Sequence, residues 1–121
     1  MLVRDHTQAA QEFLGASDWE FAAGDTLQAS EKLWGAAAHA IMAVAEQRGL
    51  EHGTHRALVN AARTIADAVG SELIRAEMRL GISAAQHFHS NFYNRTMEPE
   101  DIEYDRPLVH RYVALMLALL E

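Results

Sequence analysis

The only two prolines of the chain, Pro99 and Pro107, both lie in its last quarter. Before Pro99, therefore, no residue lacks the backbone N–H that a helix interior requires. Alanine is abundant, and the alternation of valine, isoleucine and threonine that is typical of strands is absent. The sequence predicts an all-α protein, folded as an up-and-down antiparallel bundle of four to five helices. A length of 121 residues suits one domain, covering residues 1–121.

The first two expected helices meet at Gly24 and Asp25. The first spans about 6–23, and Gly15 weakens it enough that two short pieces are expected. The second spans about 26–48, with Asp25 as its N-cap and Gly49 at its end. We expect the first helix to turn its bulky side chains inward: Phe13, Leu14, Trp19 and Phe21. The second helix is expected to bury one arc, and the opposite arc contains Lys32, Ala36, His39, Ala43 and Glu46.

The last three helices are expected at about 54–69, at about 71–93, and from Pro99 to near the end of the chain. The fourth carries a core seam at spacings of three and four residues: Ile74, Met78, Gly81, Ala85, Phe88 and Phe92. Gly81 costs about 1 kcal/mol relative to alanine there, so a packing reason or a local break is expected. Pro107 is expected to kink or restart the fifth helix, with Asp105 capping the restarted piece.

Charge and composition exclude several classes of protein. The net charge is −7, which argues against general electrostatic binding of DNA or RNA. The chain has no cysteine, so disulfide scaffolds and cysteine-ligated zinc sites are excluded. The N-terminus lacks the apolar region of a signal peptide, and the apolar run 113–120 is too short to cross a membrane, which takes about 20 residues. We expect a soluble cytoplasmic protein.

The seven histidines do not form a recognisable metal motif. His87 and His89 are two residues apart and point to different sides of a helix. His52 and His55 are three residues apart but lie in a loop and at a helix start. Neither a zincin motif nor the Glu-x-x-His pair of a di-iron bundle is present, and there is no Gly-rich phosphate loop. The sequence therefore predicts no metal site and no cofactor.

Two clusters of polar residues are candidates for a functional site. The first, at the end of the fourth helix, is a candidate binding patch formed by His87, His89, Asn91, Tyr93 and Arg95, although the same residues could simply terminate the helix. The second is the pair Arg106 and His110, which share a helix face. A histidine that moves a proton and an arginine that steadies a phosphate are the minimum for metal-free RNA cleavage. The alternative is that both simply face solvent.

Several segments resemble the HEPN superfamily of nucleotide-binding helical domains, in particular its small stand-alone archaeal and bacterial proteins. They are "DWEFAAGD", "ASEKLWGAAAHAIMAVAEQRG", "HFHSNFYN" and "MEPEDI". The resemblance covers about residues 14–120. It implies a helical bundle that is usually dimeric, and many members are ribonucleases in toxin–antitoxin and defence systems.

The sequence departs from the catalytic motif of that superfamily, in which four to six residues separate the arginine from the histidine. Only three residues separate Arg106 from His110, and Pro107 follows the arginine. Arg48 and His55 are separated by six residues, but glycines interrupt that segment. The resemblance therefore favours the fold and the dimer over catalysis, and the expected function is a non-catalytic module that binds a nucleotide, RNA or a partner protein.

The sequence also allows two alternative functions and predicts one subunit interface. The alternatives are a ribonuclease that uses Arg106 and His110, and a bundle with an apolar ligand pocket formed by Trp19, Trp34, Phe88 and Phe92. The segment 108–120 is apolar around nearly its whole circumference, which a single bundle rarely covers. We therefore expect a homodimer whose contact residues are Leu108, Tyr112, Leu115, Met116 and Leu119.

Overall fold

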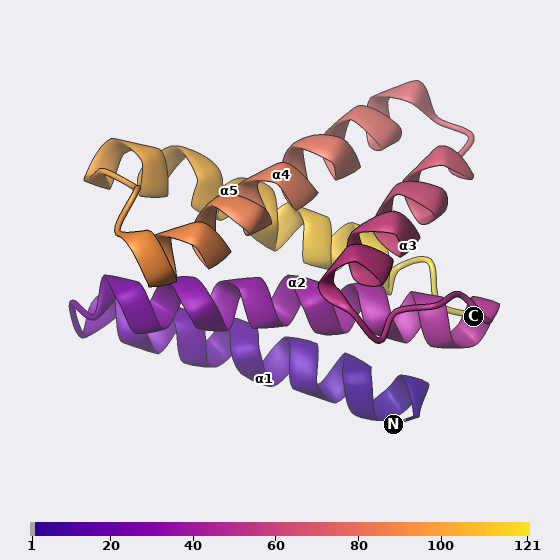
Figure 1. Ribbon diagram of the computed structural model, residues 1–121, viewed down its shortest axis with the longest axis horizontal. Helices are drawn as coiled ribbons and strands as arrows, with labels where there is room; N and C mark the ends of the chain where they lie inside the picture. Colours follow the sequence, from indigo (N-terminus) through magenta and orange to yellow (C-terminus); the bar gives the residue numbers. More distant parts are fainter. Residues whose placement is uncertain (1) are drawn as a thin grey trace.

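The computed structural model describes residues 2–121, which form five helices and no strand. The helices are α1 (Val3–Ala22), α2 (Thr26–Arg48), α3 (His55–Asp67), α4 (Glu72–Asn94) and α5 (Pro99–Leu117). The prediction of an all-α bundle is confirmed (Figure 1). Within the described residues, no helix is both long enough and apolar enough to cross a membrane.

Helix α2 is the centre of the bundle and contacts all four other helices. Figure 1 shows α1 along one side of it, with α3, α4 and α5 on the other. The second arc of α2 is therefore covered as well: Ala36 and Ala43 are fully buried. Both lie about one turn from His39, whose ring contacts His6 of α1, so α1 covers this arc. Small alanine side chains allow this close approach.

Helix α1 is one continuous helix that begins at Val3, rather than two short pieces. Its inward positions include Ala10 and Ser17, which are fully buried. Ser17 donates its hydroxyl hydrogen to the carbonyl of Ala29 at 2.9 Å, which satisfies the buried polar group. Trp19 lies two residues further along the chain and is 69% exposed, so its predicted inward position was wrong. A step of two residues turns a side chain to the opposite side of a helix.

Side chains cap the N-termini of α2, α3 and α4, and the caps of α2 are the predicted ones. Asp25 accepts the backbone N–H of Gln28, and Gly49 ends α2 in the left-handed conformation with φ 68°. Thr54 and Ser71 cap the next two helices in the same way. These local signals place the bounds of α2 at the predicted residues and those of α3 and α4 within two residues.

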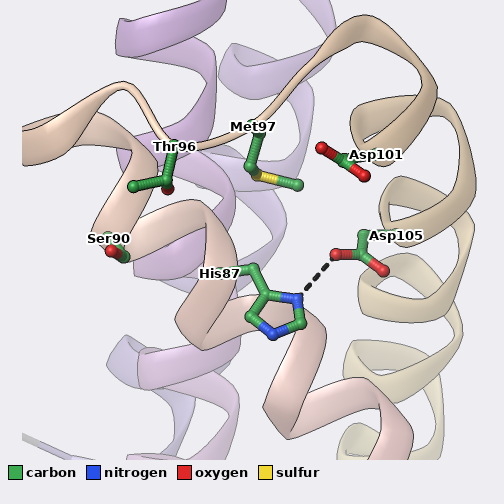
Figure 2. Close-up of a pocket in the computed structure, with 6 residues that line it drawn as sticks. All are labelled: His87, Ser90, Thr96, Met97, Asp101 and Asp105. Carbon is green, nitrogen blue, oxygen red and sulfur yellow. Dashed lines mark hydrogen bonds and ion pairs between the residues drawn. The ribbon is translucent and has the colours of Figure 1, made fainter.

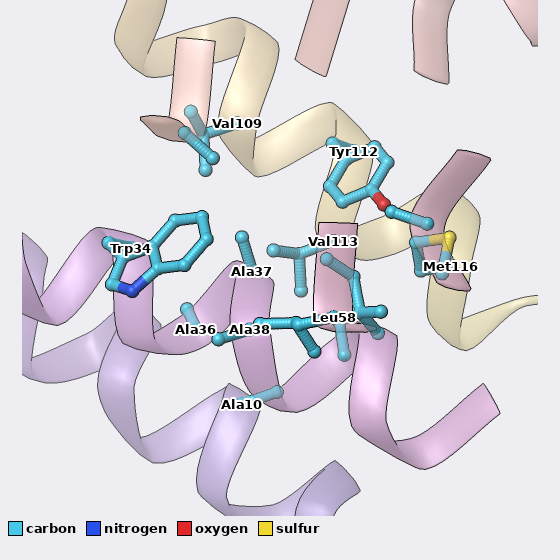
Figure 3. Close-up of a cluster of buried hydrophobic side chains, with 14 of the residues drawn as sticks. Ala10, Trp34, Ala36, Ala37, Ala38, Leu58, Val109, Tyr112, Val113 and Met116 are labelled. Atoms are coloured by element: carbon cyan, nitrogen blue, oxygen red, sulfur yellow. The ribbon is translucent and has the colours of Figure 1, made fainter. Parts of the chain in front are cut away.

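The core lies between α2 and the layer formed by α4 and α5 (Figure 3). Helix packing explains why residue 81 of α4 is a glycine, because a Cβ atom at this position would lie 2.4 Å from Cβ of Tyr112. The glycine thus lets α4 and α5 meet around a tyrosine that is only 1% exposed. The buried part of α5 comprises Val109, Tyr112, Val113 and Met116.

Pro107 does not restart α5, which runs continuously from Pro99 to Leu117. A proline removes one backbone donor from the helix. Glu103, four residues earlier, is exposed, so water can reach this side of the helix. Asp105 caps nothing and instead contacts α4. Pro99 occupies the first turn of the helix, as predicted.

Candidate functional site

The predicted binding patch separates into three environments. His87 points toward α5, where its Nδ1 lies 2.8 Å from Oδ2 of the buried Asp105. This pair forms one wall of a pocket of about 470 Å³ at the turn between α4 and α5, and Asp101 and Met97 form part of the opposite side (Figure 2). Two carboxylates and a single imidazole make this pocket acidic, so it disfavours phosphate groups.

His89 and Tyr93 belong to a second environment, in which they contact rings from α2 and α3. The His89 ring stacks on Trp34 with centroids 4.8 Å apart and on His55 with centroids 5.6 Å apart. The rings of Trp34 and His55 are also in contact, with centroids 5.4 Å apart, and Tyr93 makes a T-shaped contact with His89, also at 5.4 Å. We call these four residues the ring cluster. Trp34 is its buried base, and His55 and Tyr93 are its exposed members.

Asn91 and Arg95 have structural positions at the same helix end. Asn91 is 2% exposed, donates to Oγ of Ser30 at 3.0 Å and accepts the backbone N–H of Met97 at 2.9 Å. Its amide groups are therefore used inside the protein, and its prediction as a binding residue was wrong. Arg95 ends α4 in the left-handed conformation with φ 52°, and its side chain is exposed.

The structure brings Arg106 and His110 together on one carboxylate. The guanidinium of Arg106 lies 2.9 Å from Oδ1 of Asp18, and Nε2 of His110 lies 3.2 Å from the same oxygen. Arg106 also covers the ring of Phe21 at 4.3 Å. The negative charge of Asp18 offsets the positive charge that this pair would offer to a phosphate.

Sequence reasoning missed a further group, which we call the histidine cluster: His6, His39, Glu46 and His52. Nδ1 of His6 lies 3.0 Å from Nδ1 of His39, and Nε2 of His52 lies 3.3 Å from Oε2 of Glu46. Burial lowers the pKa of both His6 and His39, and for His6 the neighbouring His39 and His52 lower it further. Only the high number of histidines in the sequence pointed toward such a group.

The four aromatic residues expected to line an apolar pocket do not share one environment. Trp19 is exposed on α1, whereas Phe88 is fully buried in the core beside Phe21. Trp34 stacks in the ring cluster, and Phe92 contacts Tyr93. These positions remove the basis for the predicted apolar ligand site.

Comparison with known proteins places the chain in a family. The model of the archaeal PaREP1/PaREP8 family matches residues 5–113. The chain belongs to this family. No curated protein and no solved structure matches it.

The PaREP1/PaREP8 match includes all the site residues described above. The ring cluster, the pocket beside His87, the contacts of Asp18 and the histidine cluster all lie within residues 5–113. They are therefore parts of the PaREP1/PaREP8 region itself. The residues predicted at the dimer contact extend beyond it, since Leu115, Met116 and Leu119 follow the last matched residue.

Proposed function

We propose that this PaREP1/PaREP8 protein binds a nucleotide or a short single-stranded RNA at the ring cluster. The observation that carries the proposal is the combination of exposed and buried rings: Tyr93 is 67% exposed, and it is anchored through His89 on Trp34, which is 7% exposed. Tyrosine and histidine rings are the side chains on which unpaired bases stack. A ring that is already held in place loses little conformational entropy when a base stacks on it.

Two arginines are close to the exposed rings in the sequence. Arg56 follows His55 in the first turn of α3, and Arg95 lies two residues after Tyr93. Both side chains are exposed. Among residues 2–121, neither of them forms an ion pair, whereas four other arginines do: Arg75, Arg79, Arg106 and Arg111. Arg56 and Arg95 are therefore available to phosphate groups, and the N-terminus of α3 adds partial positive charge.

The net charge of −7 fits a local site better than an extended nucleic-acid surface. Each phosphate contact to a single strand contributes about −0.7 to the slope of log affinity against log salt. Two contacts, one for each arginine, give a slope of about −1.4. The proposed complex is thus held mainly by stacking and depends only weakly on salt.

The resemblance to the HEPN superfamily supports this proposal, because it implies nucleotide or RNA binding in a helical bundle. The resemblance also implies a toxin–antitoxin or defence context, and in these contexts we expect RNA to be the ligand. We place the protein in the cytoplasm, where both ligands occur. Because Arg106 and His110 are held by Asp18, the proposed role is binding without catalysis.

The experiment that tests the proposal measures the binding of a fluorescently labelled single-stranded oligoribonucleotide, with adenosine monophosphate as competitor. Tyr93→Ala is expected to weaken binding at least about fivefold, because stacking on one base contributes about 1–3 kcal/mol. Tyr104→Ala is the matched control, since Tyr104 is 71% exposed on α5, outside the ring cluster. An affinity unchanged in Tyr93→Ala, or absence of binding by the unmodified protein, contradicts the proposal.

A second pair of variants tests the phosphate contact. Arg56→Gln is expected to weaken binding and to reduce the salt slope by about 0.7. Arg63→Gln is its control, because Arg63 is exposed on the same helix, two turns further along. Equal losses in the two variants indicate nonspecific charge attraction and count against the site.

The same samples test the ribonuclease alternative. Incubation of the oligoribonucleotide in the presence of a metal chelator is expected to leave it intact. Cleavage that disappears in His110→Ala contradicts the non-catalytic proposal. Such a result would require that the RNA displace Asp18 from Arg106 and His110.

We also propose a homodimer, with a surface that differs from the predicted one. Tyr112 and Met116 are buried within one chain, so a second copy cannot contact them. The remaining apolar groups flank an ion pair of 2.9 Å between Arg111 of α5 and Glu77 of α4. At helical spacing from this pair lie two exposed leucines of α4 and two half-buried leucines of α5: Leu73, Leu80, Leu108 and Leu115.

Sedimentation measurements check the dimer. Leu80→Glu is expected to convert a dimer into a folded monomer, because the side chain is 52% exposed in one chain and its loss leaves the core intact. Leu2→Glu is the control, since Leu2 is 59% exposed at the start of the chain. If the unmodified protein sediments as a monomer at micromolar concentration, the dimer proposal is wrong.

A further inference from the structure

The histidine cluster lies at one end of the bundle, where α1 begins and α2 ends. Figure 1 shows the start of α1, the end of α2 and the loop before α3 at the same end of the molecule. His6 comes from α1, Glu46 from the last turn of α2, and His52 from the following loop. His6 is only 5% exposed, so a polar ring is held inside the protein beside two other imidazoles and a carboxylate.

The tautomer of His52 is set by its neighbours. Its Nδ1 lies 2.8 Å from the backbone carbonyl of Leu50, and a carbonyl can only accept, so Nδ1 carries a hydrogen. In the neutral ring, Nε2 then presents a lone pair to Oε2 of Glu46, 3.3 Å away. Two acceptors face each other there, which is favourable only if a proton or a metal cation lies between them. A ring that donates its other N–H to a carbonyl is the usual arrangement of a metal-binding histidine.

The distances suit a small tetrahedral ion. Two atoms bound to zinc at about 2.0–2.1 Å with tetrahedral angles are about 3.3–3.4 Å apart. The Glu46–His52 contact already has this spacing. One ligand atom each from His6, Glu46 and His52 lies within 4.8 Å of the other two. The partly exposed Glu46 and the loop residue His52 can move the remaining distance, while His6 is fixed in the interior.

We propose that His6, Glu46 and His52 bind one divalent transition-metal ion of the zinc class. Two imidazoles and one carboxylate are a ligand set for zinc and its neighbours rather than for magnesium or calcium, which prefer oxygen ligands. Three protein ligands leave the fourth position open to water or a small ligand. His39 is a positioning residue, because its contact of 3.0 Å with Nδ1 of His6 fixes the orientation of that ring.

The proposed ion also links segments that are far apart in the sequence. It joins the first turns of α1 to the end of α2 and the loop before α3, which supply its three ligands. An ion that binds only the folded chain stabilises it by mass action. Metal binding is therefore expected to raise the melting temperature in proportion to the logarithm of the free metal concentration.

The test uses the full chain, freed of any affinity tag and stripped of metal with a chelator. Titration with Zn²⁺ is expected to give one ion bound per chain, and Co²⁺ is expected to give the intense visible absorption of four-coordinate cobalt. Glu46→Gln and His52→Gln are each expected to weaken Zn²⁺ binding at least tenfold. The matched controls Glu51→Gln and His87→Gln, at exposed positions outside the cluster, are expected to leave the affinity unchanged.

Three results would overturn the site. They are a stoichiometry well below one ion per chain, a Zn²⁺ affinity that is unchanged in Glu46→Gln, and equal losses in the controls. Glu46 and His52 are partly exposed, so their variants keep the core, and circular dichroism checks that they are folded. The test of the metal site therefore needs no variant of the buried His6. Because the ring cluster has other residues, RNA binding by the same variants is expected to be unchanged.

Discussion

Replacement of Trp34 by alanine is expected to lower the free energy of unfolding by about 3–5 kcal/mol. The indole is 7% exposed and joins the core formed by α2, α4 and α5 (Figure 3). It also supports His89, which stacks on it at 4.8 Å, so the substitution leaves a cavity and removes an aromatic contact. A loss of this size is a large part of the free energy of unfolding of a typical domain, which is about 5–15 kcal/mol.

Trp19→Ala is the matched control. Trp19 is 69% exposed on α1, and its replacement is expected to change the stability by about 0.5 kcal/mol or less. Urea denaturation followed by circular dichroism compares the two variants, because this signal does not depend on tryptophan itself. Equal effects of the two substitutions would contradict the assignment of Trp34 to the core and Trp19 to the surface. The Trp34 variant is also expected to lose RNA binding, since the ring cluster loses its base.

The bounds of the helices could be predicted because they depend on local chemistry. Asp25 caps α2 through a bond to a backbone N–H three residues away, and Gly49 ends it in a conformation that favours glycine. Neither feature requires knowledge of the rest of the chain. The exceptions are α1, which begins at Val3 and has no break at Gly15, and Pro107, where the expected break is absent and α5 continues.

The covering of α2 could not be predicted, because alanine fits both a core and a surface. Ala36 and Ala43 gave no indication of whether a helix would pack on them, and α1 does. The exposure of Trp19 could not be predicted either, because the hydrophobicity of its side chain favours burial. The structure instead buries Ser17, whose hydroxyl donates to the backbone carbonyl of Ala29 in α2.

The candidate sites depend on contacts between residues that are distant in the sequence. Arg106 and His110 were identified together, but Asp18, which holds both, lies in α1 at the other end of the chain. The pairing of His52 with Glu46 was missed because a helix end separates them, so the helical spacing rule does not apply. Tyr93 and His89 were predicted as neighbours, whereas Trp34 and His55 join them only through the packing of α2 and α3 against α4.

The second large effect is expected at Gly81, where valine should lower the free energy of unfolding by about 3 kcal/mol or more. A Cβ atom there would lie 2.4 Å from Cβ of Tyr112 and 2.8 Å from its Cγ. The Cβ atom of Tyr112 is bonded directly to the backbone of α5 and cannot rotate away, so α4 and α5 must separate and expose a tyrosine that is now buried.

Gly15→Val provides the control for Gly81→Val, because Gly15 also lies inside a helix and no atom would meet its added Cβ within 4 Å. Glycine and valine differ by less than about 1 kcal/mol in helix propensity, so the control is expected to change the stability by no more than that. Thermal and urea unfolding of both variants separate propensity from packing. If Gly81→Val is as stable as Gly15→Val, then α4 and α5 do not meet at Gly81, and the packing that places His87 beside Asp105 is wrong as well.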